Sequence, residues 1–274
     1  ITGATNGIGK AAAARLAAMG HNVVIVGRSE QKCLATSDEL FHRCGRGVSW
    51  LVADLASQAA VRRLAEEFLR RFERLDVLIN NAGAVYLQRQ VTVDGQEMGW
   101  AVNYFQAFLL THLLLDRLKA APVGRIINLS SNFHWAARLN LKNLQERGIY
   151  IGWNVYARTK LASLYFTREL SRRLAGSKVT VNAIHPGLVA TGMGKTSGWL
   201  LRAIFRVVDR FAIPAERGAD GLVYLALAPE LQTVCGAYYD GLKARRSSPI
   251  SYNQVIARRL WQKSLEITGL GTEP

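Results

Sequence analysis

Short apolar strands alternate with longer helix-forming segments along this chain, and the alternation constrains the fold more than any other feature. Strand-like runs occur at 21–26, 48–54, 75–83, 124–131 and 179–184. Helix-forming runs occur at 10–19, 30–43, 59–72, 97–119 and 156–170. Strands that alternate with helices at this spacing form a parallel sheet covered on both faces. We therefore predict the α/β class, as one doubly wound domain over residues 1–274.

The composition agrees with one large core. The chain has 274 residues, of which 49% are hydrophobic, and no Pro/Gly/Ser-rich linker or internal repeat divides it. Its cysteines, Cys33, Cys44 and Cys235, form no CxxC pair and no cluster with metal-ligand spacing. We therefore expect a reducing compartment, no disulfide framework and no metal site.

The net charge of +15 raises the question of a nucleic-acid partner. The arginines are spread over several helices, and no tract that mixes aromatic and basic residues accompanies them. We therefore predict solvated helix faces and no nucleic acid. Attraction to a phosphate-bearing cofactor or to an anionic membrane surface is the next alternative.

The start of the chain lies in the middle of an expected element. The sequence opens at Ile1-Thr2-Gly3, so we expect that upstream residues supplied most of the first strand. A targeting or anchoring segment would also lie upstream, outside this sequence. No run of 18 apolar residues occurs in the chain.

A glycine-rich turn leads directly into the first helix-forming run. Gly3, Gly7 and Gly9 precede the alanine-rich segment 10–19, which Gly20 ends. Glycines in such a turn let a pyrophosphate approach the backbone at a helix N-terminus, where N–H groups and the helix dipole favour anions. A purely structural tight turn is the alternative. The residues predicted to bind a cofactor here are Gly3, Thr5, Asn6, Gly7, Ile8 and Gly9.

The ends of the next two strands carry predictions about the nucleotide. The strand 21–26 ends in Gly27-Arg28-Ser29, where many NAD-binding folds have an acidic residue that binds the ribose 2′-hydroxyl. Arg28 instead suits a 2′-phosphate, which favours NADP(H) over NAD(H); a solvated loop arginine is the alternative. Asp54 and Leu55 are predicted to meet the adenine edge, and Asp54 has a second interpretation as a helix cap.

Tyr156 and Lys160 are the candidate pair for proton chemistry. They are four residues apart in a helix-forming segment, so both side chains share one helix face. A lysine ammonium near a phenol lowers the tyrosine pKa, which would allow proton exchange with an alcohol or carbonyl. Tyr239 and Lys243 have the same spacing, but an Asp-Gly turn signal separates them and excludes a shared helix face.

Other polar residues stand where a doubly wound sheet binds ligands. Asn103 lies near the start of the helix 97–119, as a core amide or as part of a proton path. The strand from Gly124 delivers Ser130 and Ser131 to its carboxyl end, the edge at which open parallel sheets bind ligands.

With these segments placed, the chain resembles the short-chain dehydrogenase/reductase family over essentially its whole length. The resemblance implies a Rossmann fold. It is carried by Thr2-Gly3-x3-Gly7-x-Gly9 as the cofactor turn, Asn80-Asn81-Ala82-Gly83 as the sheet-stabilising motif, and Pro186-Gly187 with Thr191 as the nicotinamide segment. Asn103, Ser131, Tyr156 and Lys160 resemble the family's catalytic four. The 25 residues from Ser131 to Tyr156, and the C-terminal tail, are most similar to the retinol dehydrogenase-like branch.

The resemblance implies a role for each of the catalytic four. Ser131 would hold the substrate oxygen, with Ser130 as the lesser candidate, and Tyr156 would be the general acid or base. Lys160 would lower the Tyr156 pKa and bind the nicotinamide ribose, and Asn103 would support a proton-relaying water. The remaining cofactor contacts implied are Asn81, Ala82, Gly83, Pro186, Gly187 and Thr191.

The segment 192–213 is the expected substrate side. Apolar residues recur at helical spacing between Leu201 and Phe211, with arginines rotated away from them. It is interpreted as a substrate lid, as an interfacial helix that touches acidic lipid, or as an amphipathic core helix. Trp135, Trp153 and Trp199 are candidate substrate contacts, with surface or core packing as the alternative.

These observations predict an NADP(H)-dependent oxidoreductase for a lipophilic alcohol/carbonyl pair, retinoid-like or another lipid aldehyde or steroid-like ketone. Two alternatives remain: a nucleotide-sugar epimerase or dehydratase on the same fold, and an NADP(H)-binding module without turnover. The expected location is the cytoplasmic face, with membrane association (at the endoplasmic reticulum in a eukaryote) and a homodimer left open.

Overall fold

The computed structural model describes residues 1–188 and 213–271. Its helices are α1 (Gly7–Ala18), α2 (Glu30–Cys44), α3 (Gln58–Arg71), α4 (Met98–Trp100), α5 (Gln106–Ala120), α6 (Gly152–Arg173), α8 (Ala215–Leu227) and α9 (Gln254–Thr268). Its strands are β1 (Val24–Gly27), β2 (Ser49–Val52), β3 (Val77–Asn80), β4 (Gly124–Leu129), β5 (Val179–His185), β6 (Tyr238–Asp240) and β7 (Lys243–Arg245). Among these described residues no helix is both long and apolar enough to cross a membrane.

The strands form a mostly parallel sheet in two hydrogen-bonded pieces. One piece pairs β1 with β2, and the other has the order β3-β4-β5-β6-β7, in which only β6 and β7 are antiparallel. The first residues of the chain join the pieces, because Thr2 bridges to Val26 of β1 and donates its N–H to the Ile79 carbonyl of β3 at 3.0 Å. Ile1 and Thr2 thus stand in the position of a central strand.

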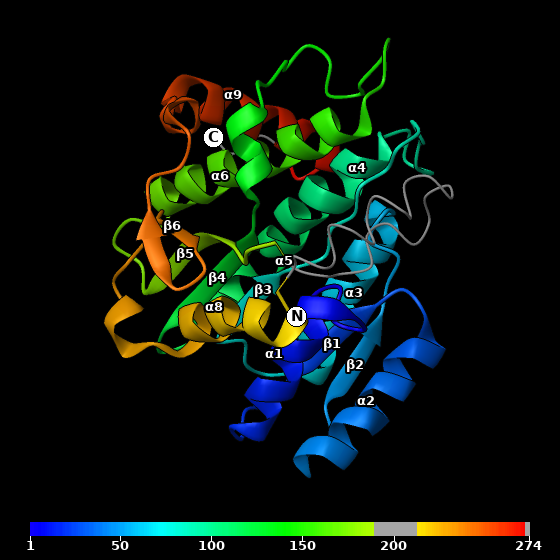
Figure 1. Cartoon of the computed structure of the whole chain (residues 1–274), viewed down its shortest axis with the longest axis vertical. Helices are drawn as coiled ribbons and strands as arrows, with labels where there is room; N and C mark the ends of the chain where they lie inside the picture. The colour runs from blue at the N-terminus through cyan, green and yellow to red at the C-terminus, as the bar shows by residue number, and fades with distance from the viewer. Residues whose placement is uncertain (189–212, 272–274) are drawn as a thin grey trace.

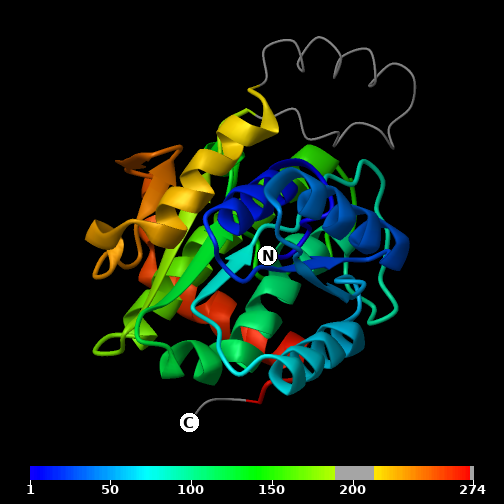
Figure 2. The same cartoon turned by 90° about the horizontal axis from the view of Figure 1, so that it is seen from below.

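Helices cover both faces of this sheet (Figures 1 and 2). One face carries α1, α2 and α8, which share a core with Ile25 and Ile184. The other carries α3, α5, α6 and α9, and its core holds the fully buried Trp100 and Phe108. The strands are buried from both sides, which agrees with their continuous apolar character. The predicted doubly wound α/β fold is confirmed.

The predicted long helix 97–119 contains one irregular turn. The chain forms α4, then the π-helical turn η1 (Ala101–Phe105), then α5. Asn103 lies inside this turn, and its amide bonds the loop after β3 instead of facing solvent. π-turns in α-helices occur frequently at functional sites. A single-sequence helical pattern does not reveal the extra residue.

Candidate active site at the carboxyl ends of the strands

The glycine-rich turn is held against the end of β3 by hydrogen bonds. The Thr2 hydroxyl accepts the backbone N–H groups of Asn81 and Ala82 at 3.0 and 3.1 Å. The Asn81 amide donates to the carbonyl oxygens of Thr2 and Gly3 at 2.8 and 3.1 Å. The Asn-Asn-Ala-Gly motif therefore determines the shape of the turn that precedes α1.

Two glycines of this turn have no room for a side chain. A Cβ on Gly9 would lie 2.4 Å from the Asn81 amide nitrogen, and one on Gly3 would lie 2.9 Å from the Ala82 backbone. Gly3 and Gly7 also have φ of 64° and 55°, which favours glycine. The Asn6 side chain accepts the Gly7 N–H at 2.8 Å at the start of α1. A glycine-rich turn at a helix N-terminus suits a dinucleotide phosphate.

Asn80 links three elements behind the site. Its amide nitrogen donates to the Thr111 hydroxyl of α5 at 3.0 Å and to the Asn128 side chain of β4 at 2.9 Å. Asn128 in turn donates to Thr167 of α6 at 3.0 Å. This buried chain of polar bonds sets the position of α6, which carries Tyr156 and Lys160.

The structure brings Ser131, Tyr156 and Lys160 together. Ser131 follows β4 and is 6% exposed, while Tyr156 and Lys160 on α6 are 9% and 2% exposed. The Lys160 ammonium lies 5.5 Å from the centroid of the Tyr156 ring, so the pair does share one helix face. The Ser130 hydroxyl instead donates to the Lys160 backbone carbonyl at 3.0 Å.

Burial dominates the proton equilibria of the pair. It raises the pKa of Tyr156 to about 12, against a lowering by a hydrogen bond with the Ser131 side chain. Burial lowers the pKa of Lys160 to about 8, while its ammonium donates to the Leu129 carbonyl at 2.8 Å. The net shift of the Tyr156 pKa is therefore upward, because burial outweighs the hydrogen bond from Ser131. A lowering of this pKa by Lys160 stays a prediction.

Asn103 reaches the site from the π-turn. Its amide oxygen accepts the Ala84 N–H at 2.8 Å, and its nitrogen donates to the Ala84 carbonyl at 2.9 Å and to the Thr159 hydroxyl at 3.2 Å. A Cβ on Gly83 would lie 3.3 Å from both the Asn103 amide oxygen and the Lys160 ammonium. Asn103 thus fastens the loop after β3 beside Lys160, and its proton relay stays a prediction.

Comparison with known proteins assigns these features to a family. Residues 1–198 match the family model described as short chain dehydrogenase. The chain belongs to the short-chain dehydrogenase family. It is 41% identical to retinol dehydrogenase 13 of Mus musculus, over 98% of this chain and 83% of that protein. It is also 37% identical to polyprenol dehydrogenase of Homo sapiens, over 98% of this chain and 84% of that protein.

A solved structure has the same fold. The chain superposes on an uncharacterised protein from Mycobacterium paratuberculosis with a TM-score of 0.80, at 31% identity, covering 98% of this chain and 91% of that one. The chain is therefore a short-chain dehydrogenase of the retinol dehydrogenase-like branch, in a family of oxidoreductases that use a nicotinamide cofactor.

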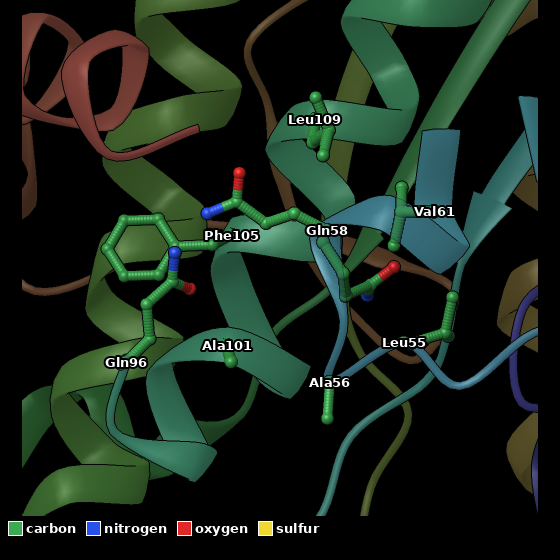
Figure 3. A pocket seen from close by; sticks show the side chains of 9 residues that line it. Leu55, Ala56, Gln58, Val61, Gln96, Ala101, Phe105 and Leu109 are labelled. Atoms are coloured by element: carbon green, nitrogen blue, oxygen red, sulfur yellow. The ribbon is translucent and has the colours of Figure 1, made fainter. Parts of the chain in front are cut away.

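The residues predicted to face the nucleotide of this short-chain dehydrogenase lie at the ends of neighbouring strands. Arg28 is exposed directly after β1, and Asp54 is exposed after β2. The Asp54 carboxylate accepts the Ala56 N–H at 3.0 Å, but the cap of α3 is Ser57. The Leu55 side chain packs inward, beside a cavity of about 10 Å³ between the start of α3 and the π-turn (Figure 3). Adenine contact by either residue stays a prediction.

The nicotinamide side is described only in part. Pro186 is buried after β5, and Gly187 has φ of 94° with Ile213 near the position of a Cβ. The Leu188 carbonyl accepts the Ile213 N–H at 2.7 Å, so these two residues lie side by side. Thr191, Trp199 and the predicted lid at 192–213, except for Ile213, lie outside the described residues.

Two aromatic rings flank the Tyr156 ring. Phe133 stacks on Trp153 with centroids 5.3 Å apart, and each meets the Tyr156 ring edge to face at 5.9 and 6.2 Å. Phe133 is 45% exposed and was not predicted; its only sequence signal is its place two residues after Ser131. Trp135 is 55% exposed and packs beside His134. The aromatic wall beside Tyr156 is therefore formed by Phe133 and Trp153.

Proposed function

We propose that this chain is an NADP(H)-dependent oxidoreductase that interconverts a lipophilic alcohol and its carbonyl compound, retinoid-like, a lipid aldehyde or a steroid-like ketone. The observation that carries the proposal is the buried cluster of Ser131, Tyr156 and Lys160 beside an aromatic wall. The printed names of the relatives, retinol and polyprenol dehydrogenases, are in keeping with an apolar substrate.

In the proposed reaction Ser131 and Tyr156 bind the substrate oxygen. Both hydroxyls are buried, so hydrogen bonds to a carbonyl oxygen act in a medium that strengthens them. With a pKa of about 12, Tyr156 keeps its proton at neutral pH and can donate it to the oxygen as negative charge develops there. The bound nicotinamide supplies or accepts the hydride.

Lys160 acts on this step through its position. Its ammonium is anchored to the Leu129 carbonyl between Tyr156 and the loop at Gly83. The ribose of a bound nicotinamide would contact this ammonium in the proposed complex. Phe133 and Trp153 would pack against an apolar chain or ring next to the reacting carbon, which favours flat, apolar substrates.

The preference for NADP(H) rests on the end of β1. Arg28 is exposed there, and the sequence Gly27-Arg28-Ser29 contains no carboxylate to repel a 2′-phosphate. Membrane contact by the segment 192–213, a homodimer and a cytoplasmic-face location stay predictions.

The test is cofactor consumption with NADPH and then NADH, against retinal, long-chain aldehydes and steroid ketones. We expect turnover with NADPH and with apolar carbonyls only. Bound NADPH without turnover on any of them would support the alternative of a binding module. Turnover of a nucleotide sugar would instead support an epimerase or dehydratase.

A further inference from the structure

His134 is completely enclosed directly beside the catalytic centre. It lies in the short 3-10 helix η2 (Asn132–Ala136), three residues after Ser131, and its side chain is 0% exposed. A histidine buried to this degree needs partners for both ring nitrogens. The structure supplies both, from opposite directions.

The two hydrogen bonds determine the tautomer of His134. The Ser248 backbone N–H donates to Nε2 at 3.0 Å, so Nε2 must be the unprotonated nitrogen. Nδ1 therefore carries the proton and donates it to the Ser131 carbonyl oxygen at 2.6 Å. Burial lowers the His134 pKa, and the charges of Arg168 and His185 lower it further, while the Ser131 carbonyl raises it.

The partner on the far side of the ring is itself fixed to α6. Arg168 of α6 donates to the Ser251 carbonyl at 3.0 Å and to the Ser247 hydroxyl at 2.6 Å. Its guanidinium also lies 3.8 Å from the centroid of the Tyr252 ring. The segment 247–252 is thus attached to the same helix that presents Tyr156.

The first turn of η2 has a second anchor. The Tyr238 hydroxyl of β6 donates to the Asn132 side chain at 2.6 Å, and the Tyr238 ring meets His134 edge to face at 5.1 Å. The Ser131 hydroxyl hydrogen-bonds the Tyr156 side chain and accepts the Phe133 N–H at 3.4 Å. The Ser131 carbonyl accepts two hydrogen bonds from His134, one from the backbone N–H at 3.1 Å and a shorter one from the ring at 2.6 Å. The ring bond is the one that connects this carbonyl to the segment 247–252.

We propose that His134 is a positioning residue for Ser131, which it holds in register with Tyr156 by linking the Ser131 carbonyl to the segment 247–252. The inference rests on the proposed function for its kinetic consequence. Both ring nitrogens are occupied by backbone groups, so His134 is not an acid or base for the substrate. An error of about 1 Å in such a hydroxyl costs on the order of 100-fold in rate.

Two variants each keep one of the two hydrogen bonds of the His134 ring and remove the other. His134→Asn places an amide donor where Nδ1 stands but does not reach Ser248. His134→Gln reaches Ser248 with a carbonyl oxygen but removes the ring donor from the Ser131 carbonyl, which keeps only the backbone N–H of residue 134 at 3.1 Å. We expect kcat with a good carbonyl substrate to stay within about 3-fold for the Asn variant and to fall by about 30-fold for the Gln variant. NADPH affinity should be unchanged in both.

His112→Asn is the matched control. His112 on α5 contacts the Phe108 carbonyl through Nδ1 at 2.7 Å, as His134 does with Ser131, but far from η2 in the chain. We expect no change of kcat in this control. Equal losses for His134→Asn and His134→Gln, or a parallel loss of kcat and NADPH affinity, would overturn the positioning role.

A measurement without substrate keeps the inference independent of turnover. The tautomer can be read from long-range ¹H–¹⁵N correlation spectra of the imidazoles, in which the His134 signals are those that disappear in His134→Asn. We expect the neutral Nδ1–H tautomer of His134 at pH 7. A neutral Nε2–H tautomer or an imidazolium at that pH would overturn the inference. If the wild type shows the expected tautomer but reduces no carbonyl, the proposed function fails while the link to Ser131 stands.

Discussion

The chain contains two Tyr-x3-Lys pairs, and the structure treats them in opposite ways. Tyr156 and Lys160 share a helix face, and both are buried beside Ser131. Tyr239 lies on β6 and Lys243 on β7, on either side of a hairpin turn. In the antiparallel register of these strands, Lys243 lies opposite Asp240. Lys243 is exposed, while Tyr239 is buried near Tyr224 with ring centroids 6.4 Å apart. The same Tyr-x3-Lys spacing thus brings the two side chains together for proton chemistry only where both residues lie on one helix that faces the site.

The largest expected effect separates the two tyrosines. Tyr156→Phe removes the proton donor, so turnover should fall by about 1,000-fold or more, while NADPH affinity stays nearly intact. Tyr239→Phe keeps the buried ring and should leave kcat unchanged. Steady-state kinetics and cofactor titration of both variants measure this difference. Comparable losses in the two variants would mean that the hairpin pair matters for the reaction.

The burial of Lys160 should make the stability of the fold depend on pH. The Lys160 pKa falls from its ordinary 10.5 to about 8 in the folded protein, so the unfolded chain binds more protons between these values. Burial of Lys160 therefore destabilises the fold fully below pH 8, by about 3 kcal/mol, and this penalty disappears as pH rises toward 10.5.

Denaturation of the cofactor-free protein tests this sign. Lys160→Met should gain stability relative to wild type at pH 7, and the gain should shrink by pH 10. Lys243→Met, at the exposed position, is the control for the loss of a surface charge. A pH-independent difference for Lys160→Met would contradict the lowered pKa.

A smaller effect concerns the preference for NADPH over NADH of the site that contains Tyr156 and Lys160. Arg28→Asp places a carboxylate where we propose the 2′-phosphate binds, so the NADPH/NADH ratio of kcat/KM should fall by about 30-fold. Arg63→Asp, at an exposed position of α3, is the control for a general change of charge. An unchanged ratio in the Arg28 variant would remove Arg28 from the phosphate site.

The smallest expected effect concerns the aromatic wall beside Tyr156. Phe133→Ala should raise KM for an apolar aldehyde by about 10-fold, because the stack with Trp153 beside Tyr156 is lost. A short polar aldehyde should be affected much less. Trp135→Ala, which changes the exposed neighbour, should leave both KM values near wild type. Equal effects on both aldehydes would argue against an apolar substrate contact.

The sequence was informative where local pattern and function coincide. The glycine turn, the Asn-Asn-Ala-Gly motif and the helical Tyr156–Lys160 spacing are each readable from a few neighbouring residues. Phe133 and His134 were missed because their roles depend on partners far along the chain: Trp153 for one and Ser248 for the other. The π-turn at Asn103 was missed because one extra residue per turn leaves the apolar pattern of the helix almost intact.

By itself, then, the sequence determined the doubly wound α/β class, the family and the residues that carry its motifs, because periodicity and turn chemistry are local properties. Only the tertiary structure decided which serine faces Tyr156, which aromatic rings flank it and how its proton is held. The Tyr156 pKa shows the reason. The spacing to Lys160 indicates a lowered value, but the burial produced by packing α6 onto the sheet raises it to about 12. Desolvation depends on everything that surrounds a group, and that is a property of the folded chain.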